Sequence, residues 1–232
     1  MPDKPGPSAG SQTLSRGIRL LEILTAAGRN MSIDELAEAL EVHRSVAYRL
    51  LRTLEDHGLI ARDPGGRIAL GAGLAALASG VSRDLQQAAL PELRAVANEL
   101  GATCLLAVRL DRAEAVTLTS AAPEQSVAIT YRPGHRHPLS RGGPGKAILL
   151  QLPEDTWPAE LRDELASSRA RGFAVSHDEV VPSLWSVAVP LAVPGQPAGS
   201  LAVVHVSLPR PEAEIAERLR TAAAAVVRAL GG

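Results

Sequence analysis

The chain has 232 residues, of which 46% are hydrophobic and 2% aromatic, so it is long enough for two domains with aliphatic cores. A formal net charge of −1 excludes a general attraction to nucleic acid, so any such affinity requires locally placed Arg side chains. The single cysteine, Cys104, excludes an internal disulfide and fits a reducing cytoplasm, and no run approaches the ~18 apolar residues of a membrane span.

The N-terminal residues predict a tail followed by a helix. Residues 1–11 are rich in Pro, Gly and Ser, which predicts a disordered tail without the apolar run of a signal peptide. Residues 14–27 carry apolar side chains at helical spacing and predict an amphipathic helix. The side chains that we expect to face inward are Leu14, Ile18, Leu21 and either Leu24 or Thr25.

Residues 32–54 predict two helices joined by a short turn. The first helix spans 32–40, where Ser32 and Glu35 have the spacing of a capping box that satisfies free backbone donors of the first turn. A three-residue turn leads to a second helix over 44–54. Two helices joined in this way form a helix-turn-helix, the geometry that inserts the second helix into the major groove of DNA.

The second helix has an apolar side and a cationic side. Its expected buried stripe is Val46, Leu50, Leu51 and Leu54. The residues that then face outward, and that we expect to contact DNA, are Arg44, Ser45, Tyr48, Arg49 and Arg52. Guanidinium groups suit phosphates and guanine edges, and Arg49 and Arg44 are the expected contacts to bases.

Charge is separated within this segment, although it has no net charge. Residues 12–71 contain eight Arg and eight Asp or Glu, but the acids gather on the first helix of the pair, whereas Arg44, Arg49 and Arg52 lie on the second. A helical hairpin with solvated mixed charge is the alternative interpretation. The residues that follow argue against it.

Residues 59–70 predict a β-hairpin. Two short apolar runs, 59–62 and 67–70, flank the turn Asp63-Pro-Gly-Gly66, and Arg62 and Arg67 lie beside its tip. We expect Arg67 to contact a backbone phosphate. The order helix, helix, helix, hairpin predicts a winged helix-turn-helix over 12–71.

The remaining residues predict a linker and an α+β domain. Residues 72–90 are rich in Ala and Leu and predict a linker helix that packs against another copy of itself, and Pro91 is expected to begin a new helix to Leu100. Over 91–232, strands in the middle with helices before and after predict one sheet with helices packed against it. The expected strands are 103–110, 114–120, 126–131, 173–175, 185–193 and 200–207, and the later helices are 145–151, 161–171 and 211–230.

Several polar groups of the C-terminal half are candidate chemical sites. Residues 140–147 look like a phosphate loop but lack its first glycine, and Ala147 replaces the Ser or Thr that binds Mg²⁺, so nucleotide hydrolysis is disfavoured. The glycine-rich turn still suits an anion or a polar ligand. His135 and His137 are interpreted as solvated loop residues rather than metal ligands.

Other groups have structural or pocket interpretations. Residues 177–179, His-Asp-Glu, are interpreted as a loop with solvated charge, because no nucleophile is placed beside them. Cys104 lies in an apolar run and is interpreted as a buried structural thiol. His205 interrupts an apolar run, and it is interpreted either as a core residue or as part of a pocket wall.

The motifs in their order resemble the IclR family of bacterial transcriptional regulators. The similarity lies in 12–21, 49–58, Gly145-Lys-Ala147, Arg171-Gly-Phe-Ala-Val175 and the following Pro190, and it extends from about residue 12 to the C-terminus. The resemblance implies a winged helix-turn-helix, a dimerising linker helix and a GAF-like effector-binding domain, without cofactor or catalytic activity. It also implies a cytoplasmic homodimer or dimer of dimers, the homotetramer, on a palindromic operator.

The resemblance also implies an effector pocket. The matching positions are Gly143, Pro144, Ser176, Ser186, Ala202 and Val204, to which we add His205. Ser176 stands where an acid is frequent in the family, Ser186 where cysteine is frequent, Ala202 and Val204 where serines are usual, and His205 where glycine is usual. Fewer polar partners weaken the binding of a small carboxylate. We therefore expect a larger or more apolar effector, or a degenerate site.

Two alternatives to a ligand-responsive regulator stay open on the sequence. An enzyme fused to a DNA-binding head would need a nucleophile with a base, or a metal cluster, and neither is visible in the pattern. A purely structural dimerisation module would need no ligand and would have a filled core. A cavity near Gly143, Ser186 and His205 would argue against that module.

Overall fold

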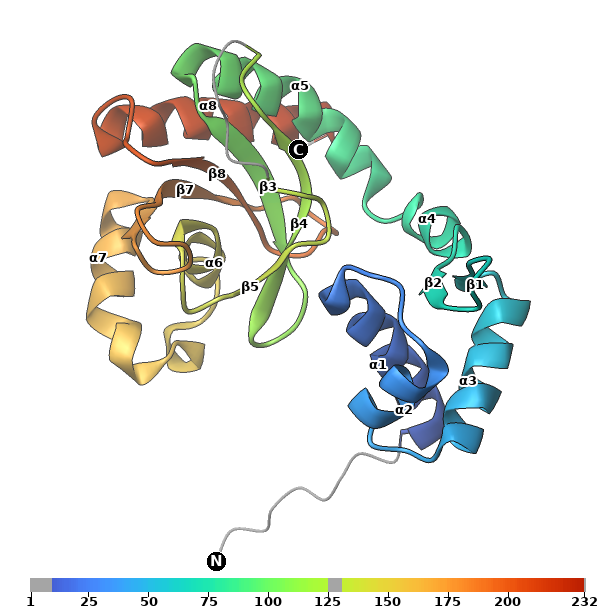
Figure 1. Cartoon of the computed structure of the whole chain (residues 1–232). Coiled ribbons are helices and arrows are strands. Elements are labelled where there is room, and N and C mark those ends of the chain that lie inside the picture. Colours follow the sequence, from blue (N-terminus) through green and yellow to red (C-terminus); the bar gives the residue numbers. More distant parts are fainter. Residues whose placement is uncertain (1–9, 125–130, 232) are drawn as a thin grey trace, which may run out of the picture. The chain divides into compact units, whose positions relative to one another are not determined.

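The computed structural model describes residues 10–124 and 131–231, and it divides the chain after Val81 into two compact units (Figure 1). The expected tail therefore lies almost wholly outside the described residues. Within the described ranges, no helix is long and apolar enough to cross a membrane.

The N-terminal unit has the expected winged helix-turn-helix order. The helix at the start, α1, is capped by the Ser11 hydroxyl, which accepts from the backbone N–H of Leu14 at 3.3 Å, and it ends at Gly28 with a φ of 61°. The elements are α1 (Gln12–Ala27), α2 (Ile33–Ala39), α3 (Arg44–Asp56), β1 (Ile60–Arg62), β2 (Ile68–Leu70) and α4 (Gly73–Ala78).

The inward face of α1 differs from the prediction. Leu14 is 64% exposed and Ile18 is 50% exposed, so these two predicted positions are wrong, whereas Leu24 is buried and Leu21 is half-buried against the core as expected. Leu20, which was not expected to face inward, is fully buried. Both Leu20 and Leu21 are available for a stripe at helical spacing, and the stripe through Leu20 and Leu24 is the one that packs into the core of the unit. That core consists of Leu20, Leu24, Met31, Leu36, Leu50, Leu51, Ile60 and Ile68.

The predicted hairpin is present and is joined to a third segment. Strands β1 and β2 pair antiparallel with Ile60 opposite Leu70, and Met31 bridges to Ile68 on the other side of β2. Ile60 and Ile68 turn into the core, so the hairpin is fixed to the helices through its apolar face.

The linker differs from the expected pair of helices. After α4 the chain turns at Ser82, which has a φ of 45°, and α5 (Arg83–Leu100) then runs without interruption through Pro91. The expected helix start at Pro91 is therefore wrong. Proline removes one backbone hydrogen bond there, but a buried apolar stripe continues on both sides of it. The buried residues of α5 are Leu85, Ala89, Leu93, Val96, Ala97 and Leu100.

The C-terminal unit is built on one antiparallel sheet of six strands in the order β5-β4-β3-β8-β7-β6. The strands are β3 (Thr103–Arg109), β4 (Glu114–Ala121), β5 (Arg136–Pro138), β6 (Ala174–His177), β7 (Trp185–Leu191) and β8 (Gly199–His205). Five of them match expected strands. The strand expected over 126–131 falls almost entirely outside the described residues, and the short β5 was not expected.

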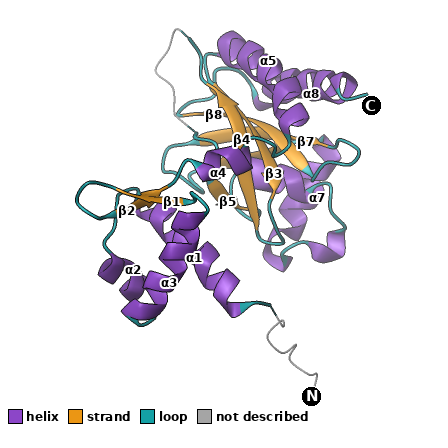
Figure 2. Ribbon diagram, turned by 90° about the vertical axis from the view of Figure 1, so that its right-hand side faces the viewer, coloured by secondary structure: helices purple, strands orange, loops and turns teal. Residues whose placement is uncertain are grey.

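Helices cover both faces of this sheet (Figure 2). Helices α5 and α8 (Glu212–Ala229) pack on one face, and α6 (Gly143–Leu149) packs on the other, with α7 (Arg162–Arg171) beside β6. Alternate residues of each strand face the two layers: Leu106 packs with α5 and α8, while Leu105 packs with α6.

Cys104 lies on the α5 and α8 face and is fully buried, which confirms the structural thiol. Burial raises the pKa of its thiol to about 12, because the charged thiolate would lose its hydration. The group is therefore a neutral, inert part of the core.

Candidate nucleic-acid interface and ligand cavity

The two sides of α3 match the predicted division. Ala47, Leu50 and Leu51 are buried against the core, and Val46 and Leu54 are half-buried. Ala47 was not expected in the stripe. The outward positions, all exposed, are Arg44, Ser45, Tyr48, Arg49 and Arg52.

The guanidinium groups of α3 differ in how they are paired. Arg44 Nη1 lies 2.7 Å from both carboxylate oxygens of Asp34 on α2, but the side chains are 67% and 65% exposed. An exposed pair of this kind contributes little and opens at little cost when a stronger anion approaches. Within the described ranges no acid pairs with Arg49 or Arg52, so these two cations are available to an incoming phosphate or base.

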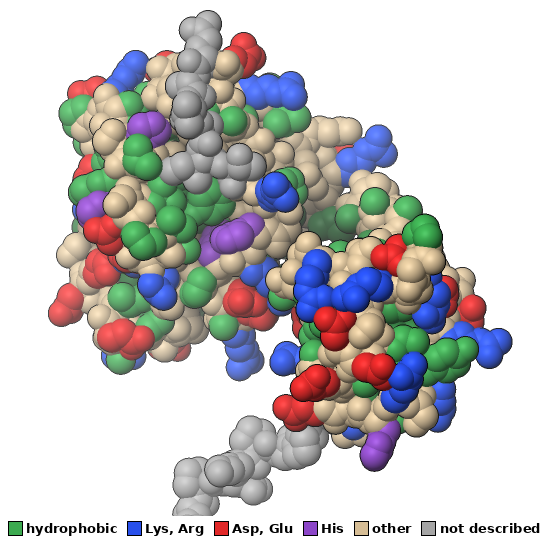
Figure 3. All heavy atoms as spheres, viewed as in Figure 1, with side chains coloured by type: hydrophobic (Ala, Val, Ile, Leu, Met, Phe, Trp, Pro, Cys, Tyr) green, Lys and Arg blue, Asp and Glu red, His purple; other side chains and the backbone are tan. Residues whose placement is uncertain are grey.

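Charge on the N-terminal unit is mixed rather than uniform. On the face that Figure 3 shows, Lys and Arg side chains alternate with Asp and Glu side chains. This agrees with the balanced charge of residues 12–71. Affinity for a polyanion therefore depends on the face of α3 and not on the charge of the whole unit.

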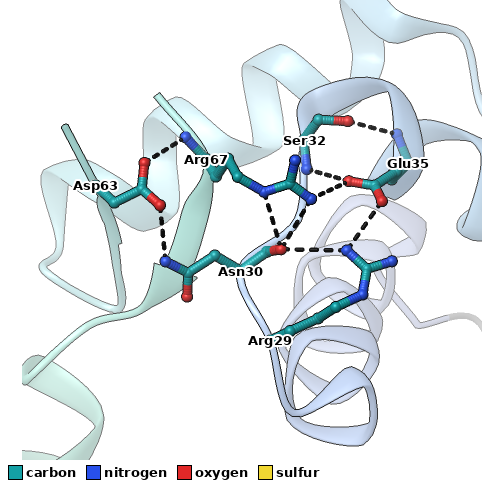
Figure 4. Close-up of polar contacts among 6 residues, drawn as sticks. All are labelled: Arg29, Asn30, Ser32, Glu35, Asp63 and Arg67. Atoms are coloured by element: carbon teal, nitrogen blue, oxygen red, sulfur yellow. Dashed lines mark hydrogen bonds and ion pairs between the residues drawn. The ribbon is translucent and has the colours of Figure 1, made fainter. Parts of the chain in front are cut away.

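Arg67 is held by contacts within the unit. Its Nη2 lies 2.8 Å from Glu35 Oε2, and its Nε and Nη2 donate to the backbone carbonyl of Asn30 at 3.2 and 3.1 Å (Figure 4). The side chain is 45% exposed. Arg67 therefore ties the second strand of the hairpin to the start of α2, and only part of its guanidinium faces solvent.

Glu35 is the centre of this network. It accepts the Ser32 backbone N–H at 2.6 Å while its own N–H donates to the Ser32 hydroxyl, which confirms the capping box. Arg29 Nη1 lies 2.9 Å from the other carboxylate oxygen (Figure 4). The backbone donor of Ser32 and the Arg29 side chain lower the pKa of Glu35 to about 2.

Asp63 holds the tip of the hairpin. Its carboxylate accepts from the Asn30 side-chain amide and from the backbone N–H groups of Gly65 and Arg67, each at 2.9 Å. The Asn30 amide and the backbone donors lower the pKa of this carboxyl. The wing is therefore fixed at its tip and at its base.

A small cavity lies in the C-terminal unit, where the start of α6 faces the loop between β6 and β7. Four of the seven expected effector residues line it: Pro144, Ser176, Ser186 and Val204. Its free volume is about 20 Å³, room for roughly one water molecule. In this conformation the cavity is nearly closed.

Gly143 and Ala202 lie next to this wall without lining it. The Gly143 N–H donates to the hydroxyls of Ser186 at 2.9 Å and Ser176 at 3.2 Å, and a Cβ at Gly143 would lie 2.6 Å from Ser186 Oγ. Glycine is therefore required for this close approach. Ala202 is buried in the same apolar cluster as Val204.

His205, expected at the pocket, lies on the other face of the sheet. Successive strand residues alternate between faces, so His205 shares the side of Leu201 and Val203, whereas Val204 faces the cavity. Its ring contacts the backbone of Ser207 just beyond the end of β8.

The glycine-rich turn before α6 has its donors occupied. The Gly142 N–H donates to Glu179 Oε2 at 2.8 Å, and Arg141 donates to the Glu179 carbonyl. Lys146 is 2% exposed and forms ion pairs with Glu179 and, at 2.6 Å, with Glu164. Lys146 is therefore enclosed by two carboxylates and is not available as the lysine of a phosphate loop.

The two histidines of the turn before β5 differ in environment. His135 is exposed as expected, but His137 is only 4% exposed and lines the cavity. Strand β5 pairs with β4, and this pairing turns His137 inward. The described residues include no group of three His, Cys, Asp or Glu side chains that could hold a metal ion.

Part of the cavity lining could not be found from local patterns. Arg141 and Gly142 belong to the glycine-rich turn that was expected to suit a polar ligand, but the sequence did not assign Tyr131, His137, Val180, Val181 or Leu184 to a pocket. Val180, Val181 and Leu184 are apolar residues in a polar loop, which is the signal that could have placed the loop over an apolar space. Tyr131 and His137 reach the cavity through the fold alone.

A winged helix-turn-helix with a free arginine-bearing face, followed by an α+β unit that encloses a cavity, defines a DNA-binding regulator with a sensor-type domain. Residues 13–64 match the family model of the IclR helix-turn-helix domain. The chain is 30% identical to the acetate operon repressor of Salmonella typhimurium over 76% of this chain and 73% of that protein. It therefore belongs to the IclR family and is a transcriptional regulator, not an enzyme.

Solved structures show the same fold. An IclR transcriptional regulator from Alicyclobacillus acidocaldarius is 28% identical, with a TM-score of 0.83 over 95% of this chain and 99% of that one. An IclR homologue from Microbacterium hydrocarbonoxydans, solved in complex with 4-hydroxybenzoate, is 23% identical, with a TM-score of 0.80 over 95% and 99%.

Proposed function

We propose that this regulator inserts α3 into the major groove of a palindromic operator and that a small molecule in the C-terminal cavity modulates this binding. The observation that carries the proposal is the exposed face of α3, on which Arg49 and Arg52 have no acidic partner among the described residues. A helix that is apolar on one side and cationic on the other suits a groove lined by phosphates and base edges.

The residues of this face are proposed to contact different parts of the DNA, some the base edges and others the phosphates. Arg49 and Arg44 contact base edges, and Arg44 leaves its exposed pair with Asp34 to do so. Ser45, Tyr48 and Arg52 contact bases or phosphates adjacent to those that Arg49 and Arg44 contact. The wing approaches the backbone, where the solvent-facing part of Arg67 contacts a phosphate while Glu35 holds the rest of its guanidinium.

A second copy of the chain is proposed to cover the exposed apolar side chains of the N-terminal unit. Leu14 and Ile18 on α1 line a groove with Leu54 and Leu59, and Leu77 of α4 is 69% exposed. Exposed apolar side chains that lie close together favour burial against another apolar surface, here the same surface of a second copy. A symmetric dimer presents two copies of α3, which is the reason to expect a palindromic operator, and pairs of dimers would give the tetramer.

The C-terminal unit is proposed to be a GAF-like effector domain. The buried serine pair and the cavity between α6 and the 178–184 loop support a ligand site. The 4-hydroxybenzoate complex of an IclR homologue with the same fold also supports it. A ligand acts on DNA binding only if its affinity differs between two arrangements of the protein.

The proposal is tested by selecting bound DNA from a random pool and measuring affinity for the selected sequence. We expect Arg49→Ala to weaken specific binding by roughly 1–3 kcal/mol at fixed salt. Arg112→Ala, an exposed arginine of the C-terminal unit, is the matched control and should bind normally. An unchanged affinity and footprint for Arg49→Ala would remove Arg49 from the proposed interface.

A further inference from the structure

His137 has a polar atom that the protein leaves without a partner. The side chain is 4% exposed, it lines the cavity, and its Nε2 is buried with no hydrogen-bond partner among the described residues. Buried polar groups are nearly always hydrogen-bonded, because an unmade bond there costs free energy. An unpartnered ring nitrogen in a cavity wall is a position at which a ligand can supply the missing bond.

Most of the groups that would bind a carboxylate are already used by the chain itself. The Gly142 N–H is taken by the Glu179 carboxylate, and the Gly143 N–H by the two serine hydroxyls. Lys146 is enclosed by Glu164 and Glu179, and Arg141 donates to the Glu179 carbonyl. An anionic ligand at the Gly142 N–H or at Lys146 would have to displace the Glu179 carboxylate, and the charge of Glu179 would also oppose an anion that approaches Arg141.

The remaining surface of the cavity is largely apolar. Tyr131, Pro144, Val204 and the loop residues Val180, Val181 and Leu184 provide carbon surface around the His137 ring. The two valines are 37% and 44% exposed, so they lie at the outer side of the cavity. Because the free space is only about 20 Å³, a ligand larger than water must move this loop outward.

We propose that the effector is a neutral molecule of the phenol type, with an apolar ring among these side chains and a hydroxyl that bonds to His137 Nε2. This inference rests on the proposed effector role of the cavity and names the class of ligand. His137 is then the residue that sets specificity for the hydroxyl, and Glu179 excludes the corresponding acids.

The protonation state of His137 agrees with a neutral ligand. Burial, together with the neighbouring His135, lowers the pKa of His137 to about 4, so the ring is uncharged near neutral pH. A neutral imidazole nitrogen is either a donor or an acceptor according to the tautomer, and a phenolic hydroxyl can play the opposite part in each case.

The test is calorimetric binding of phenol, toluene and benzoate to the full chain. Toluene has the shape of phenol without the hydroxyl, and benzoate adds the charge. We expect phenol to bind on the order of 10-fold more tightly than toluene, the equivalent of one buried hydrogen bond, and benzoate to bind most weakly. His137→Phe should bind phenol and toluene equally, while His137→Asn, which keeps a polar side chain, should retain part of the preference.

His57→Ala is the matched control, because His57 is an exposed histidine of the N-terminal unit and does not line the cavity. It should keep the preference for phenol. Tighter binding of benzoate than phenol, a phenol preference that survives His137→Phe, or no binding of phenol at all would each overturn the inference. Affinity for the selected operator is measured on the same samples, so a wrong ligand class is distinguished from a protein that does not bind DNA.

Discussion

Arg67 and Glu35 are 32 positions apart in the sequence, and their side chains meet at 2.8 Å across the base of the wing. One carboxylate thus caps α2, pairs with Arg29 and holds the hairpin. The base of the wing is thus tied to the start of α2 through this group, while Asp63 holds the tip.

Glu35→Gln is expected to loosen the wing. The amide keeps the shape of the side chain but loses both ion pairs and weakens the cap, so amides of residues 60–70 should exchange hydrogen faster than in the unaltered protein at neutral pH. Mass spectrometry of the exchanged peptides measures the difference. Glu38→Gln removes an exposed charge from the same helix and should leave the exchange unchanged.

The difference in hydrogen exchange of the wing between Glu35→Gln and the unaltered protein should depend on pH. The folded pKa of Glu35 is about 2 against an ordinary value of 4.5, so its stabilising effect is complete above about 4.5 and is lost as the pH falls towards 2. The two proteins should therefore differ at pH 7 and converge below pH 4.5. A difference in hydrogen exchange that increased on acidification would assign the effect to a group other than Glu35.

Asp34→Asn tests whether the Arg44 ion pair restrains DNA binding. Both side chains are exposed, so we expect the free energy of unfolding to change by less than about 0.5 kcal/mol. With its partner neutralised, Arg44 is free to meet DNA, and affinity for the selected operator should rise by roughly 0.2–1 kcal/mol. Fluorescence anisotropy at fixed salt measures this. A weaker complex would mean that Asp34 positions Arg44 for its contact.

The helix-turn-helix could be predicted because its signals are local. Ser32 and Glu35 are three positions apart, and the outward face of α3 follows from helical spacing alone. The orientation of α1 was not determined in this way, because Leu20 and Leu21 each complete a possible stripe and only packing against the other helices selects Leu20. The helix start predicted at Pro91 is also wrong, because the packing of the buried residues of α5 on both sides of Pro91 outweighs one lost backbone hydrogen bond.

The cavity depends on contacts between residues far apart in the chain. Ser176 and Ser186 were placed by the family pattern, and both line the cavity, but His137 enters it through the pairing of β5 with β4, which no local pattern indicates. The position of His205 could have been corrected by counting alternation along β8 from Leu201. The family pattern alone did not contain that information.

Glu179→Gln is expected to destabilise the C-terminal unit. Glu179 is the less exposed of the two acids at Lys146 and also accepts the Gly142 N–H, so its loss leaves a buried ammonium with one partner and weakens the loop contact. We expect a loss of about 1–3 kcal/mol in the free energy of unfolding. Trp157 and Trp185 both lie in this unit, so their fluorescence during urea unfolding reports on it.

Glu164→Gln is the matched comparison for Glu179→Gln. Glu164 is 42% exposed against 29% for Glu179, and water can replace more of its interaction, so its effect should be clearly smaller. Equal losses for the two variants would show that the charge at Lys146, and not the anchoring of the loop by Glu179, sets the stability of this region.

Ile18→Glu tests the proposed dimer surface on α1. Ile18 is 50% exposed in one copy, so a charge there should leave the fold of the unit intact, as circular dichroism would show. In a dimer that covers this groove, the charge would be buried without a partner, which costs several kcal/mol and should give monomers in light scattering. Leu110→Glu, just beyond β3 in the other unit, is the control, because Leu110 is 45% exposed. If Ile18→Glu keeps the mass of the unaltered protein while Leu110→Glu lowers it, the subunits associate through the C-terminal unit, and the α1 groove has another use.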